Sequence, residues 1–236
     1  MHPIAHIENA FQTKFGIPRQ SGLVSSFPSK IIFEPEYRNA DACRGLEEFS
    51  HIWLIWEFSE AKRTMWLPTV RPPRLGGNVR KGVFATRSPF RPNSIGLSCV
   101  KLTKVSLDEP DSPVIYVEGA DLMNGTPIFD IKPYIPYADC HPEATGSFAE
   151  FARDYHLNVE FPPHLLEKIP PESREALMAV LADDPRPAYQ NDPERSYGMP
   201  FGDKDIHFRV NGDTLWVHDV TDFVKKQQES AADCEK

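Results

Sequence analysis

The chain has 236 residues, 40% of them hydrophobic and 25% charged, which is the composition of an ordinary globular protein long enough to bury a core. No apolar segment approaches the length of about 20 residues that a membrane-spanning helix needs, and the N-terminus lacks the basic and apolar regions of a signal peptide. The four cysteines are scattered without a CxxC pair, which argues against a disulfide framework and a zinc ribbon, so we expect a cytoplasmic protein with reduced thiols and no membrane association.

The first 131 residues contain a series of short apolar segments typical of β-strands. Strands are predicted at residues 3–9, 30–34, 51–58, 82–86, 95–105, 113–119 and 126–131, with a brief helix at 40–49. The segment 51–58, HIWLIWEF, is rich in aromatic and β-branched residues, which predicts a central strand buried on both faces. Asn124-Gly125 predicts the turn before the last of these strands. Strands at this spacing, with almost no helix between them, favour an antiparallel barrel or sandwich.

The composition changes after residue 140. Residues 140–146 are predicted to form a linker, 157–161 a strand, and 173–182 a helix with the apolar face Ala176, Leu177, Val180 and Leu181. The segment 184–189, DPRPAY, ends this helix, and Asn211-Gly212 joins two predicted strands at 207–210 and 214–220 into a hairpin. The polar tail from Lys225 is expected to fray. We therefore predict a mainly β domain over residues 1–145 and a smaller α+β domain over residues 146–236.

The positive charge of the chain is concentrated in one place. Between Ala61 and Lys101 there are nine Lys and Arg and no Asp or Glu, whereas the rest of the chain has 17 basic and 34 acidic residues. A solvated loop is the simplest interpretation of a basic segment, but this one is constrained by proline and glycine, as in RPPRLGG (residues 71–77) and RSPFRPN (residues 87–93). A rigid basic surface on an acidic protein favours an anionic ligand.

A second unusual segment is NGTPIFDIKPYIPYAD, residues 124–139. An edge strand would account for its prolines but not for the close spacing of its charged and aromatic residues, Asp130, Lys132, Tyr134 and Tyr137. Aromatic rings beside charges suit a flat, partly polar ligand such as a nucleobase. Neither GxGxxG nor GxxxxGK[ST] occurs, and the histidines show no HExxH spacing, so we predict no glycine-rich phosphate loop and no metal site.

These segments carry a resemblance to a known family. RPPRLGG, GVFATRSPFRPNSIGL, NGTPIFDIKPYIPYAD and DPRPAY together closely resemble the bacterial tRNA threonylcarbamoyladenosine methyltransferases, from the PRQ corner at Pro18 to the region of Tyr189. The resemblance implies a homodimeric, S-adenosylmethionine-dependent enzyme whose N-terminal domain is a single-sheet antiparallel β-barrel. It further implies methylation of the exocyclic nitrogen of threonylcarbamoyladenosine, which lies beside the anticodon in the anticodon loop of threonine tRNA.

Site residues follow from the same resemblance. The cofactor positions carried over are Pro18, Arg19, Gln20, Arg87, Leu97, Asn124, Gly125, Thr126 and Pro127. Ser59 and Glu60 are further expected cofactor contacts, although relatives have a His-Gln pair at these positions, and Asn124 stands where the family usually has aspartate.

The implied reaction suggests roles for the residues of the segment 124–139. The acceptor nitrogen is a poor nucleophile until it loses its proton, and Asp130 is our first candidate for the base. Tyr134 and Tyr137 are expected to stack on the nucleobase, and Lys132 to hold a carboxylate or a phosphate. Arg80, Arg91 and Asn93 are expected to contact RNA. Two alternatives stay open: a non-catalytic RNA-binding β-barrel and a methyltransferase that acts on a small molecule.

Overall fold

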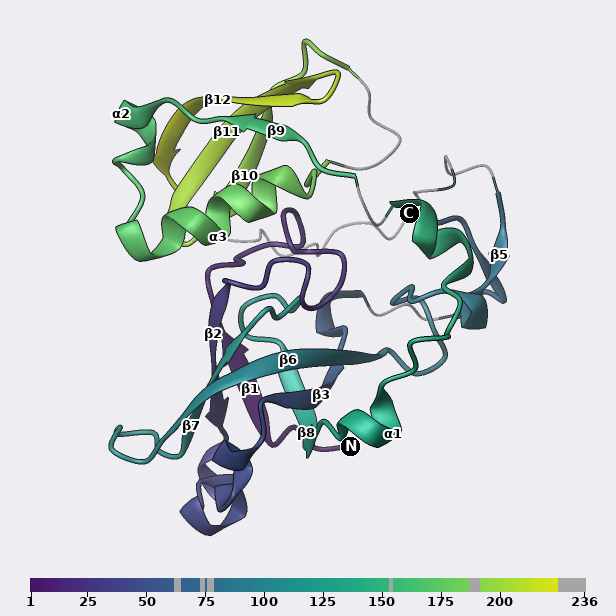
Figure 1. Ribbon diagram of the computed structural model, residues 1–236, viewed down its shortest axis with the longest axis vertical. Helices are drawn as coiled ribbons and strands as arrows, with labels where there is room; N and C mark the ends of the chain where they lie inside the picture. Colours follow the sequence, from purple (N-terminus) through teal and green to yellow (C-terminus); the bar gives the residue numbers. More distant parts are fainter. Residues whose placement is uncertain (62–64, 73–74, 76–78, 153–154, 187–191, 225–236) are drawn as a thin grey trace, which may run out of the picture.

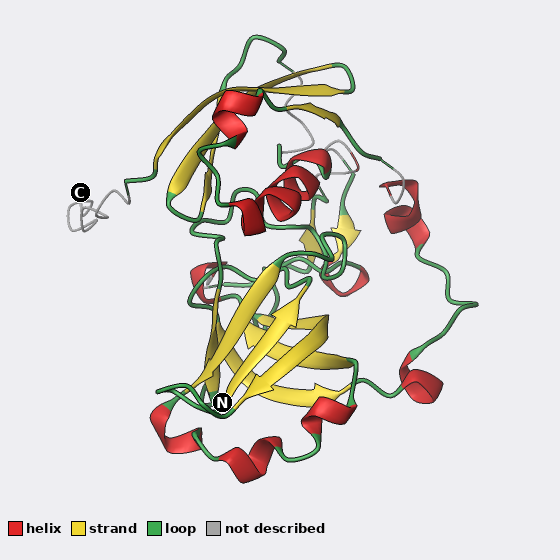
Figure 2. Ribbon diagram, turned by 60° about the vertical axis from the view of Figure 1, so that its left-hand side comes forward, coloured by secondary structure: helices red, strands yellow, loops and turns green. Residues whose placement is uncertain are grey.

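A closed, six-stranded antiparallel barrel occupies the N-terminal half of the chain. The structure, a computed structural model, describes residues 1–61, 65–72, 75, 79–152, 155–186 and 192–224. The barrel strands are β1 (Ala5–Glu8), β2 (Pro28–Phe33), β3 (His51–Glu57), β6 (Ile95–Ser106), β7 (Val114–Glu118) and β8 (Pro127–Pro133). They close in the order β1-β2-β7-β6-β3-β8, which confirms the single-sheet barrel and settles the choice between barrel and sandwich (Figures 1 and 2).

Strand β3 corrects one prediction. Its residues alternate strictly between buried and partly exposed, so it is not buried on both faces. Ile52, Leu54 and Trp56 point into the barrel, whereas Trp53 and Ile55 lie on the outer surface with partial exposure. In a small barrel each strand has one inner and one outer face, and aromatic residues on both faces do not change that geometry.

One end of the barrel gathers three connections that are far apart in the sequence. Because β1, β3 and β7 end there while β2, β6 and β8 begin there, residues 9–27, the described part of 58–94, and residues 119–126 lie at this end. The segment 58–94 includes the short pair β4 (Thr69–Val70) and β5 (Lys81–Gly82). The PRQ, TRS and NGT segments, which carry the family resemblance, therefore lie at the same end of the barrel.

The C-terminal half forms a sheet covered by a helix. Strand β9 (Asn158–Glu160) pairs parallel to β12 (Thr214–Asp222), followed by β11 (Lys204–Asn211) and β10 (Tyr197–Phe201), which are antiparallel. Helices α2 (Pro163–Leu166) and α3 (Pro171–Ala182) precede the last three strands, and α1 (Pro136–Asp139) follows the barrel. The four predicted apolar residues of α3 are all buried. The hairpin between β11 and β12 is confirmed, with Gly212 at a positive φ of 61°.

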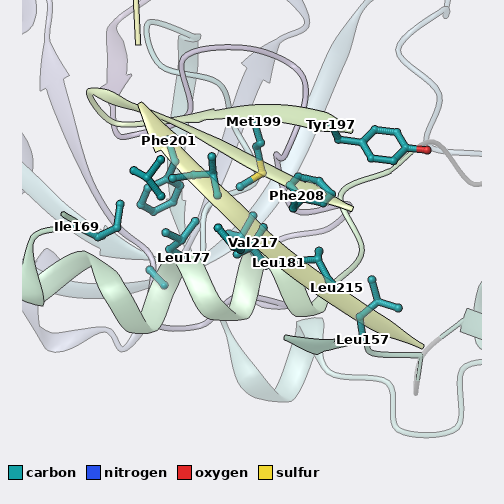
Figure 3. Close-up of a cluster of buried hydrophobic side chains, with 14 of the residues drawn as sticks. Leu157, Ile169, Leu177, Leu181, Tyr197, Met199, Phe201, Phe208, Leu215 and Val217 are labelled. Atoms are coloured by element: carbon teal, nitrogen blue, oxygen red, sulfur yellow. The ribbon is translucent and has the colours of Figure 1, made fainter. Parts of the chain in front are cut away.

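The hydrophobic core of the C-terminal half includes residues from the N-terminal half. Phe11 and Phe27, in the long β1–β2 connection, stack at 4.0 Å and pack against Phe201 of β10. They belong to the same buried cluster as Leu177 and Phe208, part of which is shown in Figure 3. The connection rises from the barrel toward α3 in Figure 1, so the two halves share one hydrophobic contact region.

Three further differences concern local structure. Residues 40–49 form two 3-10 turns, Ala40–Cys43 and Leu46–Glu48, because Gly45 adopts a left-handed φ of 82° between them. Residues 82–86 are mainly a 3-10 turn, Val83–Ala85, after the two-residue strand β5. Strand β10 was not predicted, since Gly198 and Pro200 weaken its pattern. The tail from 225 and residues 187–189 of DPRPAY lie outside the described residues.

Candidate cofactor and active site

A cavity of about 510 Å³ lies at the end of the barrel where the three connections meet. Its walls come from the loop before β2, the C-terminal end of β3, the first residues of β6, and the turns before β6 and β8. The lining residues are Lys14, Ile17, Pro18, Arg19, Gln20, Trp53, Trp56, Glu57, Phe58, Ser59, Glu60, Ala61, Thr86, Arg87, Pro89, Arg91, Ile95, Gly96, Leu97, Asp121, Met123 and Thr126. A volume of this size is within the range of sites that hold a small-molecule cofactor.

A chain of hydrogen bonds runs from the barrel interior to this cavity. The indole Nε1–H of Trp56 donates to Ser98 Oγ at 2.9 Å, and Ser98 Oγ–H in turn donates to Asp121 Oδ1. Ser98 is fully buried and Trp56 is 5% exposed. Burial raises the pKa of Asp121 above its ordinary value, although the hydrogen bond from Ser98 and the attraction of Arg87 act to lower it.

Close packing at the start of β6 fixes the position of Trp56. Gly96 pairs directly with Trp56 across β3 and β6, and a Cβ at Gly96 would lie 2.2 Å from the indole. Glycine is therefore required here for the indole to lie against the strand. This contact sets the direction of the Nε1–H and, through it, the arrangement of Ser98 and Asp121.

The PRQ corner and the TRS segment meet across the cavity. Arg87 Nη1 donates to Gln20 Oε1, which joins residues 67 positions apart. Arg19 Nη2 donates to the main-chain oxygen of Asp184 at 2.7 Å, just beyond α3. Lys14 Nζ contacts the main-chain oxygen of Glu60 from the same loop. Three cations, Lys14, Arg19 and Arg87, thus border one cavity together with the exposed Glu60, and the cofactor roles expected for Arg19, Gln20 and Arg87 stay predictions.

The NGTP turn contributes less to the cavity than expected. Of residues 124–127, Thr126 lines the cavity, and Asn124, Gly125 and Pro127 do not. Asn124 Oδ1 accepts the backbone N–H of Asn9 at 3.0 Å, and Gly125 adopts a φ of 78°. These two residues fasten the turn to β1, so their contribution to the site is indirect.

The four residues predicted to be catalytic lie on the outside of the barrel. Asp130 and Lys132 form an ion pair at 2.9 Å, with side chains 45% and 62% exposed. Tyr134 packs on Trp53 with ring centroids 5.8 Å apart, and Tyr137 is 93% exposed. These residues are not among those that line the cavity, and their catalytic roles remain predictions.

The residues predicted to contact RNA lie in the connection between β3 and β6. Arg80 and Asn93 are exposed, and Asn93 lines a second hollow of about 640 Å³ that also touches Trp66 and Arg91. Arg91 Nη1 donates to the main-chain oxygen of Thr86 at 2.7 Å, so this side chain holds the loop together. Phe84, 73% exposed, has its ring 6.1 Å from that of Trp66.

Comparison with known proteins identifies the family. The family model described as tRNA-methyltransferase O N-terminal domain matches residues 6–140, and the TrmO C-terminal domain model matches residues 154–223. The chain belongs to the tRNA-methyltransferase O family. Its members are S-adenosylmethionine-dependent tRNA methyltransferases, so the chain is a methyltransferase of this class with S-adenosylmethionine as its cofactor.

Relatives in this family cover nearly the whole chain. An Escherichia coli K12 protein named tRNA (adenine(37)-N6)-methyltransferase is 43% identical over 88% of this chain and 91% of its own length. A Pseudomonas aeruginosa protein named a putative S-adenosylmethionine-dependent methyltransferase is 38% identical, with 92% and 96% covered. The crystal structure of TrmO from Pseudomonas aeruginosa superposes with a TM-score of 0.72 and 31% identity, covering 94% of this chain and 99% of that one.

The cavity suits the chemistry of this family's cofactor. Lys14, Arg19 and Arg87 offer positive charge for a carboxylate, and the rings of Trp56 and Phe58, with centroids 4.2 Å apart, offer an apolar surface for an adenine. Among the described residues no group of three His, Cys, Asp or Glu could hold a metal ion, and no helix is long and apolar enough to cross a membrane.

Sequence reasoning missed several cavity residues that the fold brings in. Asp121 and Met123 follow β7 in a short loop without a motif, and Trp56 was assigned to the core of a central strand. The available signal was the sequence ADLMNG, a carboxylate three positions before the NGTP turn. It becomes informative only when the NGTP turn is itself placed at the cavity.

Proposed function

We propose that the chain methylates the N6 nitrogen of adenine 37 in tRNA, and that the adenine must already carry a threonylcarbamoyl group, as in threonine tRNA. The observation that carries the proposal is the single cavity built from PRQ, TRS and the turn before β8, segments brought together by the barrel ends. The Escherichia coli relative named for adenine 37 N6 methylation supports the position.

The requirement for threonylcarbamoyl follows from the acceptor chemistry. A carbamoyl substituent withdraws electrons from N6 and makes its proton easier to remove, and the threonyl carboxylate offers a negative charge to a cation-lined rim. Arg19 and Arg87 line the cavity, and Arg80 is exposed nearby in the sequence. Unmodified adenine offers neither feature, so positioning and proton removal would both be less effective.

The decisive experiment compares modified and unmodified tRNA. The protein and S-adenosylmethionine are incubated with threonine tRNA that bears or lacks threonylcarbamoyl, and the digested nucleosides are weighed. A gain of one methyl on the modified nucleoside alone supports the proposal, and equal methylation of unmodified tRNA contradicts the substrate. Binding of tRNA without methylation would favour a non-catalytic barrel, and methylation of the free nucleoside would favour a small-molecule enzyme.

Two arginines separate cofactor binding from RNA binding. Arg87 lines the cavity, whereas Arg80 is exposed outside it. Arg87→Ala should weaken cofactor binding measured by calorimetry. Arg80→Ala should weaken tRNA binding. The slope of the logarithm of the binding constant against the logarithm of the salt concentration should become shallower by about 1, as expected for one lost phosphate contact. Arg91 is a poorer probe because its substitution would also release the loop that it holds.

We also propose a cytoplasmic homodimer and a tRNA-binding role for residues 146–236. Exposed apolar residues near the cavity, Met65, Trp66, Leu67 and Phe84, offer a surface that a second copy could cover. Light scattering should give twice the 26.8 kDa of one chain, and a mass of one chain at micromolar concentration contradicts the dimer.

Because Phe11 and Phe27 pack into the hydrophobic core of the C-terminal half, we expect residues 1–145 alone to fold poorly.

A further inference from the structure

Donors from three segments of the chain hold Asp121 in the cavity. Its Oδ1 accepts from Ser98, and the backbone N–H groups of Asp121 itself and of Ser21, beside the PRQ corner, also stabilise its charge. The Trp56 Nε1–H can only donate, so Ser98 must accept from Trp56 and direct its own proton to Asp121. In this arrangement Asp121 Oδ1 is the acceptor at the end of the hydrogen-bond chain.

An ionised carboxylate keeps acceptor capacity beyond these three donors. Its two oxygens offer about four lone-pair positions, and Asp121 lines the cavity that suits the cofactor. By contrast, Asp130 is not among the residues that line the cavity, and its carboxylate forms an ion pair with Lys132. The acceptor nitrogen must reach the cofactor's methyl group, so a base for that nitrogen must also border this cavity.

From this geometry we propose that Asp121 is the general base that removes the N6 proton of the acceptor, with Ser98 as the residue that positions it. The assignment rests on the proposed function. The cofactor supplies an electrophilic methyl group on a sulfonium sulfur. With that group bound, the N–H proton of the acceptor would pass to the Asp121 carboxylate while the nitrogen took up the methyl carbon and the C–S electron pair stayed with sulfur. The carboxyl group then releases the proton to water.

The surroundings make Asp121 suitable for this role. A base works best when its pKa lies nearer the working pH than that of an exposed aspartate, and burial shifts Asp121 in that direction. The charged groups that share the cavity are Lys14, Arg19, Glu57, Glu60, Arg87 and Arg91. Of these, Arg87 acts on Asp121 and favours its charged form. Turnover should therefore fall as pH drops through the pKa of Asp121.

The test uses the full chain and four variants: Asp121→Asn, Ser98→Ala, Asp130→Asn and the control Asp111→Asn. Asp121→Asn should bind S-adenosylmethionine within about threefold of wild type by calorimetry, yet lose about 10²–10⁴-fold in kcat on modified tRNA. It should also lose the acidic limb of the pH–rate profile. Ser98→Ala removes a hydrogen bond to the charged form, so its acidic limb should move to higher pH. Asp111→Asn, in the β6–β7 turn at the other barrel end, should behave as wild type.

A readout independent of activity completes the design. In protein labelled at the aspartate carboxyl carbons, the resonance missing from Asp121→Asn should titrate above the ordinary aspartate value of about 3.9. In Ser98→Ala the same resonance should titrate higher still. A midpoint at or below the ordinary value would count against the assignment.

Three results with the variants would overturn the proposal. The first is an Asp121→Asn protein with wild-type kcat, and the second is one that loses cofactor affinity as much as kcat, which would place the carboxylate on the cofactor. Alternatively, Asp130→Asn could abolish the acidic limb while Asp121→Asn leaves it intact. If the wild-type protein adds no methyl to modified tRNA, the proposed function fails and the base assignment fails with it. If the wild-type protein methylates modified tRNA and Asp121→Asn methylates it equally fast, the base assignment fails while the proposed function stands.

Discussion

Replacing Arg186 by Met should destabilise the protein strongly, because it leaves a buried carboxylate without its charged partner. Arg186 Nε and Nη2 donate to the two oxygens of Asp184 at 2.9 and 3.0 Å, and the side chains are only 7% and 10% exposed. Breaking a buried pair costs about 3–5 kcal/mol. Two charge-assisted hydrogen bonds at about 1.5–3 kcal/mol each give the same order. Tyr155 still donates to Asp184, which favours the lower end.

Urea denaturation measures this loss. With a slope of about 3 kcal/mol per molar urea, the Arg186→Met midpoint should fall by about 1–1.5 M. The control Arg44→Met removes an exposed pair with Asp41 and should change the free energy of unfolding by less than about 0.5 kcal/mol. The double variant Asp184→Asn, Arg186→Met removes both charges and should regain at least half of the loss. A single variant that loses less than about 1 kcal/mol, or a double variant no better, would refute the reasoning.

Gly96→Ala should lower the free energy of unfolding by about 1–3 kcal/mol, because the added Cβ overlaps Trp56, and thermal unfolding will show whether the strand tolerates it. Phe27→Ala should cost about 3–5 kcal/mol and destabilise both halves in one transition, whereas Phe49→Ala, at a site 37% exposed, should cost about 0.5 kcal/mol. Separate melting of the two halves in Phe27→Ala would disagree with a shared core. The pKa of Asp139 is lowered by hydrogen bonds from the Ile135 backbone and Trp53, so its stabilisation exists above about pH 4 and is lost as pH falls through the lowered value. Asp139→Asn should therefore be less stable than wild type at neutral pH, and the gap should close in acid; a gap independent of pH would exclude this cause.

The sequence by itself determined most of the strands and the family. Alternating apolar residues located β6, β7 and β8, and Asn-Gly pairs located two turns, since both signals act within a few residues. The buried face of α3 was also predictable, because its four apolar residues follow helical spacing. The family resemblance pointed to Arg19, Gln20 and Arg87, which the fold brings to one cavity.

Tertiary structure decided the features that depend on closure of the barrel. Closure gave β3 one inner and one outer face, and it placed Asp130 outside while it brought Asp121 to the cavity. Likewise, the connection that carries Phe11 and Phe27 belongs to the second core, although it lies between two barrel strands in the sequence. Local pattern cannot reveal these outcomes, because each depends on contacts between segments that are far apart in the sequence, such as β3 with β8 and Phe27 with Phe201. The raised pKa of Asp121 has the same origin, since burial by distant segments creates it.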